Sequence, residues 1–588
     1  MTASSTLPNG FPAIREPYTG PQTGQQLSAL DIEQEDQARR EAEARQSAAA
    51  ASDPPRGAGQ AAAGETAGRH RHQPGQRTSA MYQVITALWI LLCIPMLAAA
   101  VPVIEGAFRR SGFLGGADTA TTAFIMYFWL NGMKDVVYPV AYRVTSWRRQ
   151  APARRPPGPS PLVGLLYVTC NDFSAASLTA SARQHYGNFE VCILDDTDPG
   201  KYPARIAEVD GYARRHGIPV FRRPDRPAGF KAGNLNYFLQ SPHGRRFDYF
   251  AILDSDEVIP PEFTARCLDY FADPGVGIVQ ANHAATRNRT SFMKMFAPGV
   301  DAHWPAYQQV KNHAGFLSLL GHGAMVSREA YTAAGGFPGI VAEDIGFAID
   351  ALRGGYRTAF AQDVLCEEEF PVDYAAFETR HRKWTEGNME FIRAYARRIL
   401  FSRQLRWFEK LDIILFTFSL PLTGVFSAYV VVNAIVFPLM HFSNRFPLWM
   451  LAPTVVFLVA PMFNDMMTWR HVRRRRLVSY LLHSVALFGS VYFASLFASV
   501  RTTFGGSVFH VTPKEAGKVS LRSALAQNRV KLIASVVLAT AVEAASGSVL
   551  AVILIIIPAF FGVYLSVMNA GDPPPAESGG GHVFQETE

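Results

Sequence analysis

The chain has few cysteines, and their arrangement argues against two common kinds of stabilising site. Five cysteines are spread over 588 residues, and no two of them form a C-x-x-C pair. An odd, scattered set indicates neither a disulfide framework nor a zinc site, and it is typical of reduced thiols in the cytosol. The five are Cys93, Cys170, Cys192, Cys267 and Cys366.

Both ends of the chain are poor in apolar residues. Residues 1–78 are rich in Ala, Gln, Gly, Pro and charge, and residues 571–588 are similar in composition. Such segments bury too little apolar surface to offset the conformational entropy that ordering costs. We expect both ends to be disordered and cytosolic.

Charge is scarce in several long apolar runs. These runs fall at 82–104, 119–142, 412–436 and 448–468, and a last pair lies within 530–570. Each run is close to the ~20 residues that a helix needs to cross a membrane. We therefore predict six transmembrane spans, as hairpins at 79–143 and 529–570 and two further spans within 411–500.

The excess of basic residues fits a membrane protein better than a nucleic-acid-binding one. The formal net charge is +7, and much of it lies beside apolar runs, at 143–155 and 470–476. Positive residues collect on the cytoplasmic side of membrane proteins, so we expect no nucleic-acid partner and a cytosolic soluble part. Residues 387–410, where arginines accompany Trp407, are typical of an amphipathic helix at the membrane interface.

One apolar run allows two topologies. Residues 477–500 contain no Lys, Arg, Asp or Glu and are long enough to cross a membrane. Crossing would carry the basic residues between 501 and 531 to the outside, against the positive-inside rule. We expect an interfacial or re-entrant helix, which leaves residues 501–528 in the cytosol; a span is the alternative.

Residues 144–386 have the pattern of a soluble α/β domain. Helical stretches separate short apolar runs that predict buried strands at 163–168, 189–194, 249–253 and 276–279. This alternation predicts a largely parallel sheet. Ligands bind beyond the carboxyl ends of strands in such sheets, and Asp195 and Asp254 each directly follow a predicted strand.

Two acidic pairs can carry chemistry. Asp254 and Asp256 lie two apart at a strand end, so both carboxylates can approach one hard cation that also binds phosphate oxygens. Glu343 and Asp344 can supply a base that deprotonates an attacking hydroxyl. Each pair also has an ordinary alternative, a solvated loop for the first and a helix start for the second.

Several short motifs follow one another along the chain. They are Thr169-Cys-Asn-Asp172, Leu194-Asp-Asp196, Lys231-Ala-Gly-Asn-Leu-Asn236, Asp254-Ser-Asp256, Gly335-Gly-Phe337, Ala342-Glu-Asp344, Trp384 and Phe509-His-Val511-Thr512-Pro-Lys514. This series resembles the processive family 2 glycosyltransferases, which include bacterial cellulose synthase, chitin and hyaluronan synthases and the synthases of periplasmic glucans. The last motif is similar to the gating loop of cellulose synthases.

The resemblance implies a GT-A glycosyltransferase domain and a role for each matching residue. The donor would be held by Thr169, Asp172, Asp195, Asp196, Lys231, Asp254 and Lys383, and Mg²⁺ or Mn²⁺ by Asp254 and Asp256. Asp344 would be the catalytic base, and the acceptor would contact Trp384, Glu343 and His322. The gating loop would comprise Phe509, Val511, Thr512 and Lys514.

One motif departs from the family pattern. The family's Q-x-x-R-W is Arg380-His-Arg382-Lys383-Trp384 in this chain. Lysine keeps the positive charge of arginine but loses its bidentate fork, so either Lys383 or Arg382 can contact the pyrophosphate. Nearby, Glu367-Glu-Glu369 is typical of a solvated surface run.

The resemblance implies a membrane-embedded inverting enzyme that transfers glucose from UDP-glucose to a growing β-linked polysaccharide and passes the polymer across a bacterial inner membrane. One alternative is a non-processive transferase acting on a lipid or short oligosaccharide. Another is a transporter or receptor whose soluble part only binds nucleotide. The expected partners are a UDP-sugar, a saccharide acceptor, membrane lipid and periplasmic export proteins.

Overall fold

A computed structural model describes residues 79–145, 159–224, 226, 228–442, 447–505, 513–514 and 518–572. All of them belong to the same structural unit. The predictions for residues 1–78 and 573–588, and for Phe509, Val511 and Thr512, lie outside the described residues.

The centre of the described part is a seven-stranded sheet with strand order β3-β2-β1-β4-β6-β5-β7. The strands are β1 (Val163–Thr169), β2 (Phe189–Asp195), β3 (Val220–Phe221), β4 (Tyr249–Asp254), β5 (Val276–Ala285), β6 (Ala324–Ser327) and β7 (Arg357–Glu368). Only β6 runs antiparallel to its neighbours among these strands. The four predicted strands and the largely parallel sheet are confirmed.

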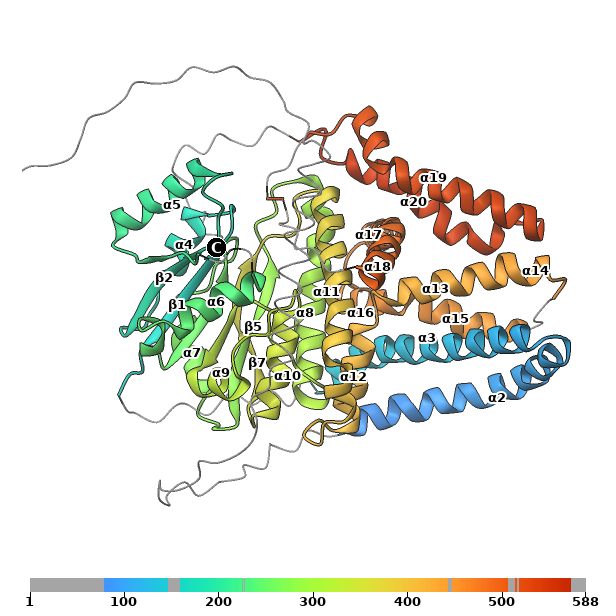
Figure 1. The fold of residues 1–588 in the computed structure, drawn as a ribbon, viewed down its shortest axis with the longest axis horizontal. Helices are drawn as coiled ribbons and strands as arrows, with labels where there is room; N and C mark the ends of the chain where they lie inside the picture. Colours follow the sequence, from blue (N-terminus) through green and yellow to red (C-terminus); the bar gives the residue numbers. More distant parts are fainter. Residues whose placement is uncertain are drawn as a thin grey trace, which may run out of the picture. The chain divides into compact units, whose positions relative to one another are not determined.

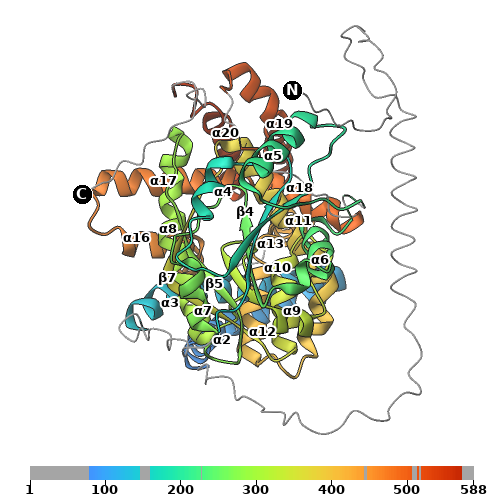
Figure 2. The same cartoon turned by 90° about the vertical axis from the view of Figure 1, so that its left-hand side faces the viewer.

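Helices cover both faces of the sheet because successive side chains of a strand point to opposite sides. In β1, Val163, Leu165 and Tyr167 pack toward one layer and Leu166 toward the other. The first layer holds α4 (Ala175–Ser181), α5 (Pro203–His216) and α7 (Phe263–Tyr270). The second holds α6 (Phe230–Gln240), α9 (Arg328–Ala334) and α10 (Glu343–Arg353); Figure 2 shows these three on the side of the strands opposite α7.

Three helices connect the sheet to the apolar helices (Figure 1). They are α8 (Ser291–Ala314), α11 (Tyr374–Leu400) and α12 (Trp407–Thr417). The fully buried carboxylate of Asp412 in α12 accepts hydrogen bonds from the Tyr138 hydroxyl at 2.9 Å and from the backbone N–H of Phe316 at 2.7 Å. A buried carboxylate is stable only when it is bonded in this way, so Asp412 fixes the junction between the two regions.

Further helices, most of them rich in apolar residues, make up most of the remaining described chain (Figure 1). They are α2 (Ala80–Arg110), α3 (Gly112–Thr145), α13 (Leu422–Val431), α14 (Phe437–Leu439), α15 (Leu451–Val459), α16 (Phe463–Thr468), α17 (Arg474–Ser490), α18 (Tyr492–Phe504), α19 (Leu521–Ser546) and α20 (Ile553–Ser566). Among the described residues, five segments are long and apolar enough to cross a membrane: Ala80–Arg110, Leu422–Leu439, Leu448–Thr468, Arg474–Phe504 and Val549–Ser566. These helices fit association with a membrane.

Two predicted helices differ from the structure. The interface helix expected over 387–410 is divided, because α11 ends at Leu400 and α12 starts at Trp407. The Ser402 hydroxyl accepts hydrogen bonds from the backbone N–H groups of Gln404 and Leu405, which stabilises the turn between them. The run 477–500 is also divided, into α17 and α18, at Val491.

Candidate active site

The residues expected to bind a donor lie at the carboxyl edge of the sheet. Thr169, Asp195 and Asp254 are the last residues of β1, β2 and β4, and these three strands are neighbours. Thr169 is paired with Asp195, and Val168 with Asp254, so the strand ends are level with one another. Sequence positions far apart are thereby brought to one edge.

Asp172 joins the ends of two of these strands. Its carboxylate accepts hydrogen bonds from the Thr169 hydroxyl at 2.9 Å and the Cys170 backbone N–H at 2.8 Å. Its other oxygen accepts one from the Ser255 hydroxyl at 2.6 Å. Asn171, between them, has φ of 64°, a left-handed conformation that asparagine tolerates better than most residues. Asp172 is therefore held rigidly at the edge.

Two arginines that sequence reasoning missed neutralise Asp195 and Asp196. Arg222 donates to Asp195 at 2.7 Å, and Arg223 donates to both oxygens of Asp196, at 2.9 Å from Nε and 2.6 Å from Nη2. Both arginines directly follow β3, which pairs in parallel with β2, so they emerge beside the end of that strand. The available signal was the basic pair directly after a short β-branched run.

Lys231 connects three elements at the centre of the site. Its ammonium donates hydrogen bonds to the carboxylate of Asp254 and, at 2.9 Å, to the carbonyl oxygen of Gly321. Lys231 lies in the first turn of α6, which starts after Gly229 in a left-handed conformation with φ of 67°. Burial by itself raises the pKa of Asp254, but the positive charges of Lys231 and His322 overcome it and hold that pKa well below the usual range.

Asp254 and Asp256 fit a divalent cation. Lys231 engages one oxygen of Asp254 and Lys514 engages one oxygen of Asp256, which leaves each carboxylate a second oxygen. Hard cations such as Mg²⁺ and Mn²⁺ prefer oxygen ligands of this kind. The contact from Lys514 also brings residues 513–514 to this edge of the sheet.

Glu343 and Asp344 begin α10 next to these groups. A Cβ built on Gly321 would lie 3.6 Å from Asp344 Oδ2, and the carbonyl of Gly321 is bonded to Lys231. Burial raises the pKa of Glu343 to about 7; the adjacent Asp344 adds to that rise and Lys231 opposes it. Burial also raises the pKa of Asp344. The pair thus takes up a proton close to neutral pH, as a general base requires.

The motif on α11 that differs from the family pattern places Lys383 near the acidic groups. Lys383 lies within electrostatic range of Glu343 and Asp254; burial lowers its pKa against the effect of these two carboxylates. The Nε of Arg382, by contrast, is buried without a hydrogen-bond partner among the described residues. Trp384 is 50% exposed, and the guanidinium of Arg380 lies 4.8 Å from the centre of its ring.

A buried polar cluster behind the acidic pair was not predicted as a unit. It consists of Glu257, His283, His322 and Glu368. Burial by itself lowers the pKa of His322, but the carboxylates of Glu257 and Asp254 raise it to about 10. The cluster therefore holds positive charge between carboxylates.

The expectation of a solvated run at Glu367–Glu369 is wrong for its last two members. The Glu368 side chain is 15% exposed and lies 3.6 Å from the His283 ring nitrogen Nδ1. Glu369 is 14% exposed and pairs with Arg289 at 2.6 Å. Glu368 ends β7, so the parallel register brings it to the same edge as the other site residues.

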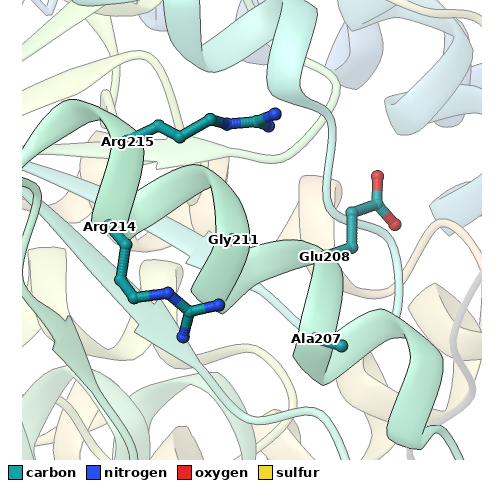
Figure 3. A pocket seen from close by; sticks show the side chains of 5 residues that line it. All are labelled: Ala207, Glu208, Gly211, Arg214 and Arg215. Atoms are coloured by element: carbon teal, nitrogen blue, oxygen red, sulfur yellow. The ribbon is translucent and has the colours of Figure 1, made fainter.

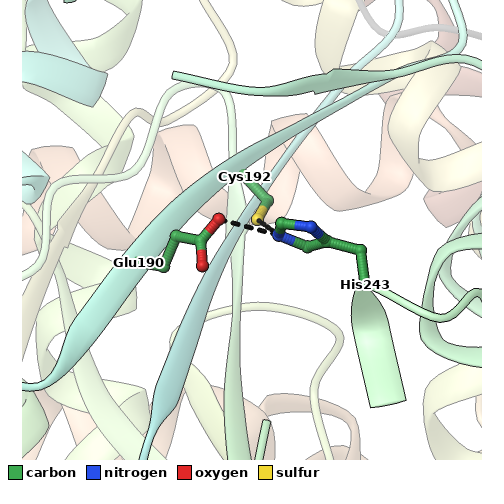
Figure 4. A group of neighbouring side chains, drawn as sticks. All are labelled: Glu190, Cys192 and His243. Atoms are coloured by element: carbon green, nitrogen blue, oxygen red, sulfur yellow. Dashed lines mark hydrogen bonds and ion pairs between the residues drawn. The ribbon is translucent and has the colours of Figure 1, made fainter. Parts of the chain in front are cut away.

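Two surface features lie outside this edge. One is a shallow pocket on α5 between Glu208 and Arg215 (Figure 3). The other is a group formed by Glu190, Cys192 and His243, shown in Figure 4. Glu190 is the second residue of β2, at the end opposite to Asp195. Neither feature involves a predicted site residue.

A known protein family matches the part of the chain that contains several of these site residues. Residues 249–462 match the family model described as "Glycosyl transferase family group 2". The matched segment contains both acidic pairs, Lys383 and Trp384. This segment of the chain is therefore similar to that family, and it includes four of the seven strands of the mixed sheet.

Two curated relatives and one solved structure are also similar to this chain. The chain is 27% identical over 276 residues to a probable glucomannan 4-beta-mannosyltransferase 15 of Arabidopsis thaliana, covering 46% of this chain and 48% of the relative. It is 28% identical over 229 residues to a probable glucomannan 4-beta-mannosyltransferase 7 of Oryza sativa subsp. japonica, covering 37% and 38%. The chain thus spans about half or less of these relatives. A mannosyltransferase of Pyrobaculum calidifontis in complex with GDP-Man and Mn²⁺ has a TM-score of 0.39 at 17% identity, over 65% of this chain and 99% of that one.

Proposed function

We propose that this protein is a membrane-embedded, inverting hexosyltransferase that moves a hexose from a nucleoside diphosphate sugar to the end of a β-linked saccharide. One observation carries the proposal: Lys231 contacts Asp254 and also Gly321, which adjoins Asp344. A phosphate-binding cation, a metal-binding carboxylate and a base are thereby within one site.

The donor is held at the ends of β1, β2 and β4. Its nucleoside contacts Thr169, Asp172, Asp195 and Asp196, and its diphosphate contacts Lys231, Asp254 and Lys383. When Mg²⁺ or Mn²⁺ is bound to Asp254 and Asp256, it supplies positive charge that stabilises the departing pyrophosphate. Lys231 and Lys383 supply further positive charge at the same place.

Asp344 acts as the base. It takes the proton of the acceptor hydroxyl while the hydroxyl oxygen forms a bond to the anomeric carbon. The bond from that carbon to the diphosphate breaks on the opposite face, so the configuration inverts. Glu343 and His322 contact the acceptor, Trp384 stacks on its sugar ring, and Lys514 contacts the nucleotide.

Two sugar nucleotides are candidates for the donor. The motif resemblance favours UDP-glucose, whereas the names of the two plant relatives favour GDP-mannose. Release of UDP or GDP by the purified protein, measured with each donor and with Mg²⁺ or Mn²⁺, separates the two. Release of neither nucleotide above a protein-free background contradicts a transferase and favours a nucleotide-binding transporter or receptor.

We further propose that the enzyme extends a polymer and passes it through the apolar helices of a bacterial inner membrane, with the sheet in the cytosol. The five apolar helices support membrane association. Product length under limiting acceptor tests this: long chains are expected, and a product one sugar longer than the acceptor contradicts processivity. A reporter fused to the C-terminus should be active in the cytosol, whereas activity only outside contradicts the orientation.

A further inference from the structure

Glu257, His283 and His322 converge on one buried position. Glu257 follows β4, His283 lies in β5 and His322 lies two positions before the first residue of β6. In the sheet β6 lies between β4 and β5, so the three side chains come from adjacent strands. One ligand atom from each lies within 4.8 Å of the others.

The spacing of these atoms suits a metal ion better than hydrogen bonds. Glu257 Oε1 lies 3.5 Å from His322 Nδ1 and 3.8 Å from His283 Nε2. Hydrogen bonds of this kind are about 2.7–3.2 Å long. A tetrahedral ion with bonds of about 2.0–2.2 Å separates its ligand atoms by about 3.3–3.6 Å. The observed separations are close to those of a shared ion.

Two of the converging atoms are buried without a hydrogen bond of normal length. Glu257 is 1% exposed, and among the described residues neither its Oε1 nor His322 Nδ1 has a hydrogen-bond partner, although the two lie 3.5 Å apart as an ion pair. Leaving a buried carboxylate oxygen without a hydrogen bond is costly. A cation bound between these atoms reduces that cost.

The opposite nitrogens of both imidazoles face another carboxylate. Glu368 Oε2 lies 3.6 Å from His283 Nδ1 and 3.7 Å from His322 Nε2. Histidines that bind a metal through one nitrogen usually direct the other N–H to a carboxylate, which fixes the ring orientation. Glu368 is the carboxylate on that side of both rings, at distances longer than a hydrogen bond. Trp304 further fixes the His283 ring by stacking on it, with ring centroids 4.3 Å apart.

A glycine is required at the point of convergence. Gly323 has φ of 57°, and a Cβ built on it would clash with both Glu257 Oε1 and His283 Nε2. Any side chain there would push the two ligand atoms apart. The absence of a side chain lets them approach each other.

We propose that Glu257, His283 and His322 form a second metal site, separate from Asp254 and Asp256, for a divalent transition metal such as Zn²⁺. Imidazole ligands favour Zn²⁺ over Mg²⁺. The ion links the ends of β4, β5 and β6 and holds the Gly321 carbonyl that Lys231 contacts. This proposal does not depend on the proposed function, because metal content is measured without turnover.

The group Glu190, Cys192 and His243 provides a matched control. There, one nitrogen of His243 is bonded to Glu190 at 2.7 Å (Figure 4). Arg246 also pairs with Glu190, at 3.4 Å. These charges are already paired within the protein. His243→Ala therefore removes a histidine of similar accessibility without touching the proposed ligands.

The test is the metal content of the full-length protein after purification in detergent and dialysis against a weak chelator. We expect one transition-metal ion per chain in the wild type, in Asp256→Asn and in His243→Ala, and its loss in Glu257→Gln and His322→Ala. Glu368→Gln should weaken metal affinity by roughly 10–100-fold. Wild-type protein titrated with Co²⁺ should develop the visible bands of nitrogen-ligated cobalt, which keeps the test valid if a variant misfolds.

Three results would overturn the second site. The first is wild-type protein that binds no Co²⁺ with nitrogen ligation. The second is metal lost from His243→Ala or Asp256→Asn but kept in folded Glu257→Gln and His322→Ala. The third is unchanged metal content in all variants, which means that His322 holds a proton between the carboxylates instead of a metal.

Discussion

The ammonium of Lys231 donates a hydrogen bond to the carboxylate of Asp254, across the gap between the first turn of α6 and the end of β4. The two residues are 23 positions apart in sequence. Lys231 keeps Asp254 ionised although that carboxylate is partly buried, because the lysine charge outweighs the effect of burial on its pKa. A carboxylate that is already ionised can accept a divalent cation without first losing a proton.

Replacing Lys231 by methionine should therefore impair donor use. The variant removes a positive charge from the diphosphate site and lets the pKa of Asp254 rise. We expect kcat/KM for the sugar nucleotide to fall about 10²–10³-fold, the range seen when one charge-stabilising group is removed. Lys201→Met, an exposed lysine after β2, is the control and should stay near wild type. Equal losses in both variants would contradict the role of Lys231.

The pH dependence of kcat should reflect the ionisation of the Glu343–Asp344 pair. The base must be ionised to take a proton, and burial raises the pKa of Glu343 to about 7. The rate should therefore be low at acid pH and rise as pH increases toward and through neutrality. Glu343→Gln removes the neighbouring negative charge, so the rise should move to lower pH. Asp344→Asn should lower kcat by roughly 10²–10⁴-fold at every pH.

A rate that is flat from pH 5 to pH 8, with chemistry shown to be the slow step by single-turnover kinetics, contradicts this account. An Asp344→Asn variant that binds donor normally and keeps its turnover contradicts the assignment of the base.

A comparison of Lys383→Met with Arg382→Met should decide which of them contacts the pyrophosphate. Lys383 has electrostatic contact with Glu343 and Asp254, so its replacement should cause the larger loss of kcat/KM, about 10²-fold or more. Lys383→Arg should retain most of the activity, because it keeps the charge. Thermal unfolding of both variants shows whether either merely destabilises the helix. A greater kinetic loss in a folded Arg382→Met protein would assign the contact to Arg382.

The Arg223–Asp196 pair should contribute to the stability of the fold. The Arg223 side chain is 4% exposed and that of Asp196 13% exposed. Removing one partner of a buried ion pair leaves an uncompensated charge, which costs about 3–5 kcal/mol of the free energy of unfolding. Arg223→Met should thus unfold at clearly lower temperature or denaturant concentration. The control is Arg205→Met, which breaks an exposed pair with Glu208 and should cost about 0–1 kcal/mol.

The sequence by itself determined the elements whose signal is local. An apolar run followed by an acidic residue is enough to predict β2 with Asp195 and β4 with Asp254, because strand burial and strand ends leave a pattern within a few residues. The long charge-poor runs predict apolar helices for the same reason. The acidic pair at Glu343 is also readable, although its raised pKa is not, since that depends on burial by distant segments.

Only the tertiary structure decided which charges meet. Arg222 and Arg223 reach Asp195 and Asp196 because β3 pairs with β2, and a strand of two residues leaves almost no pattern in sequence. Glu368 looks like part of a solvated run, yet the register of β7 beside β5 carries it to His283. Hydrophobic periodicity depends on residues close together in sequence, whereas strand order and register determine which residue pairs with a buried charge. The geometry of Glu257, His283 and His322 could therefore be seen only in the folded chain.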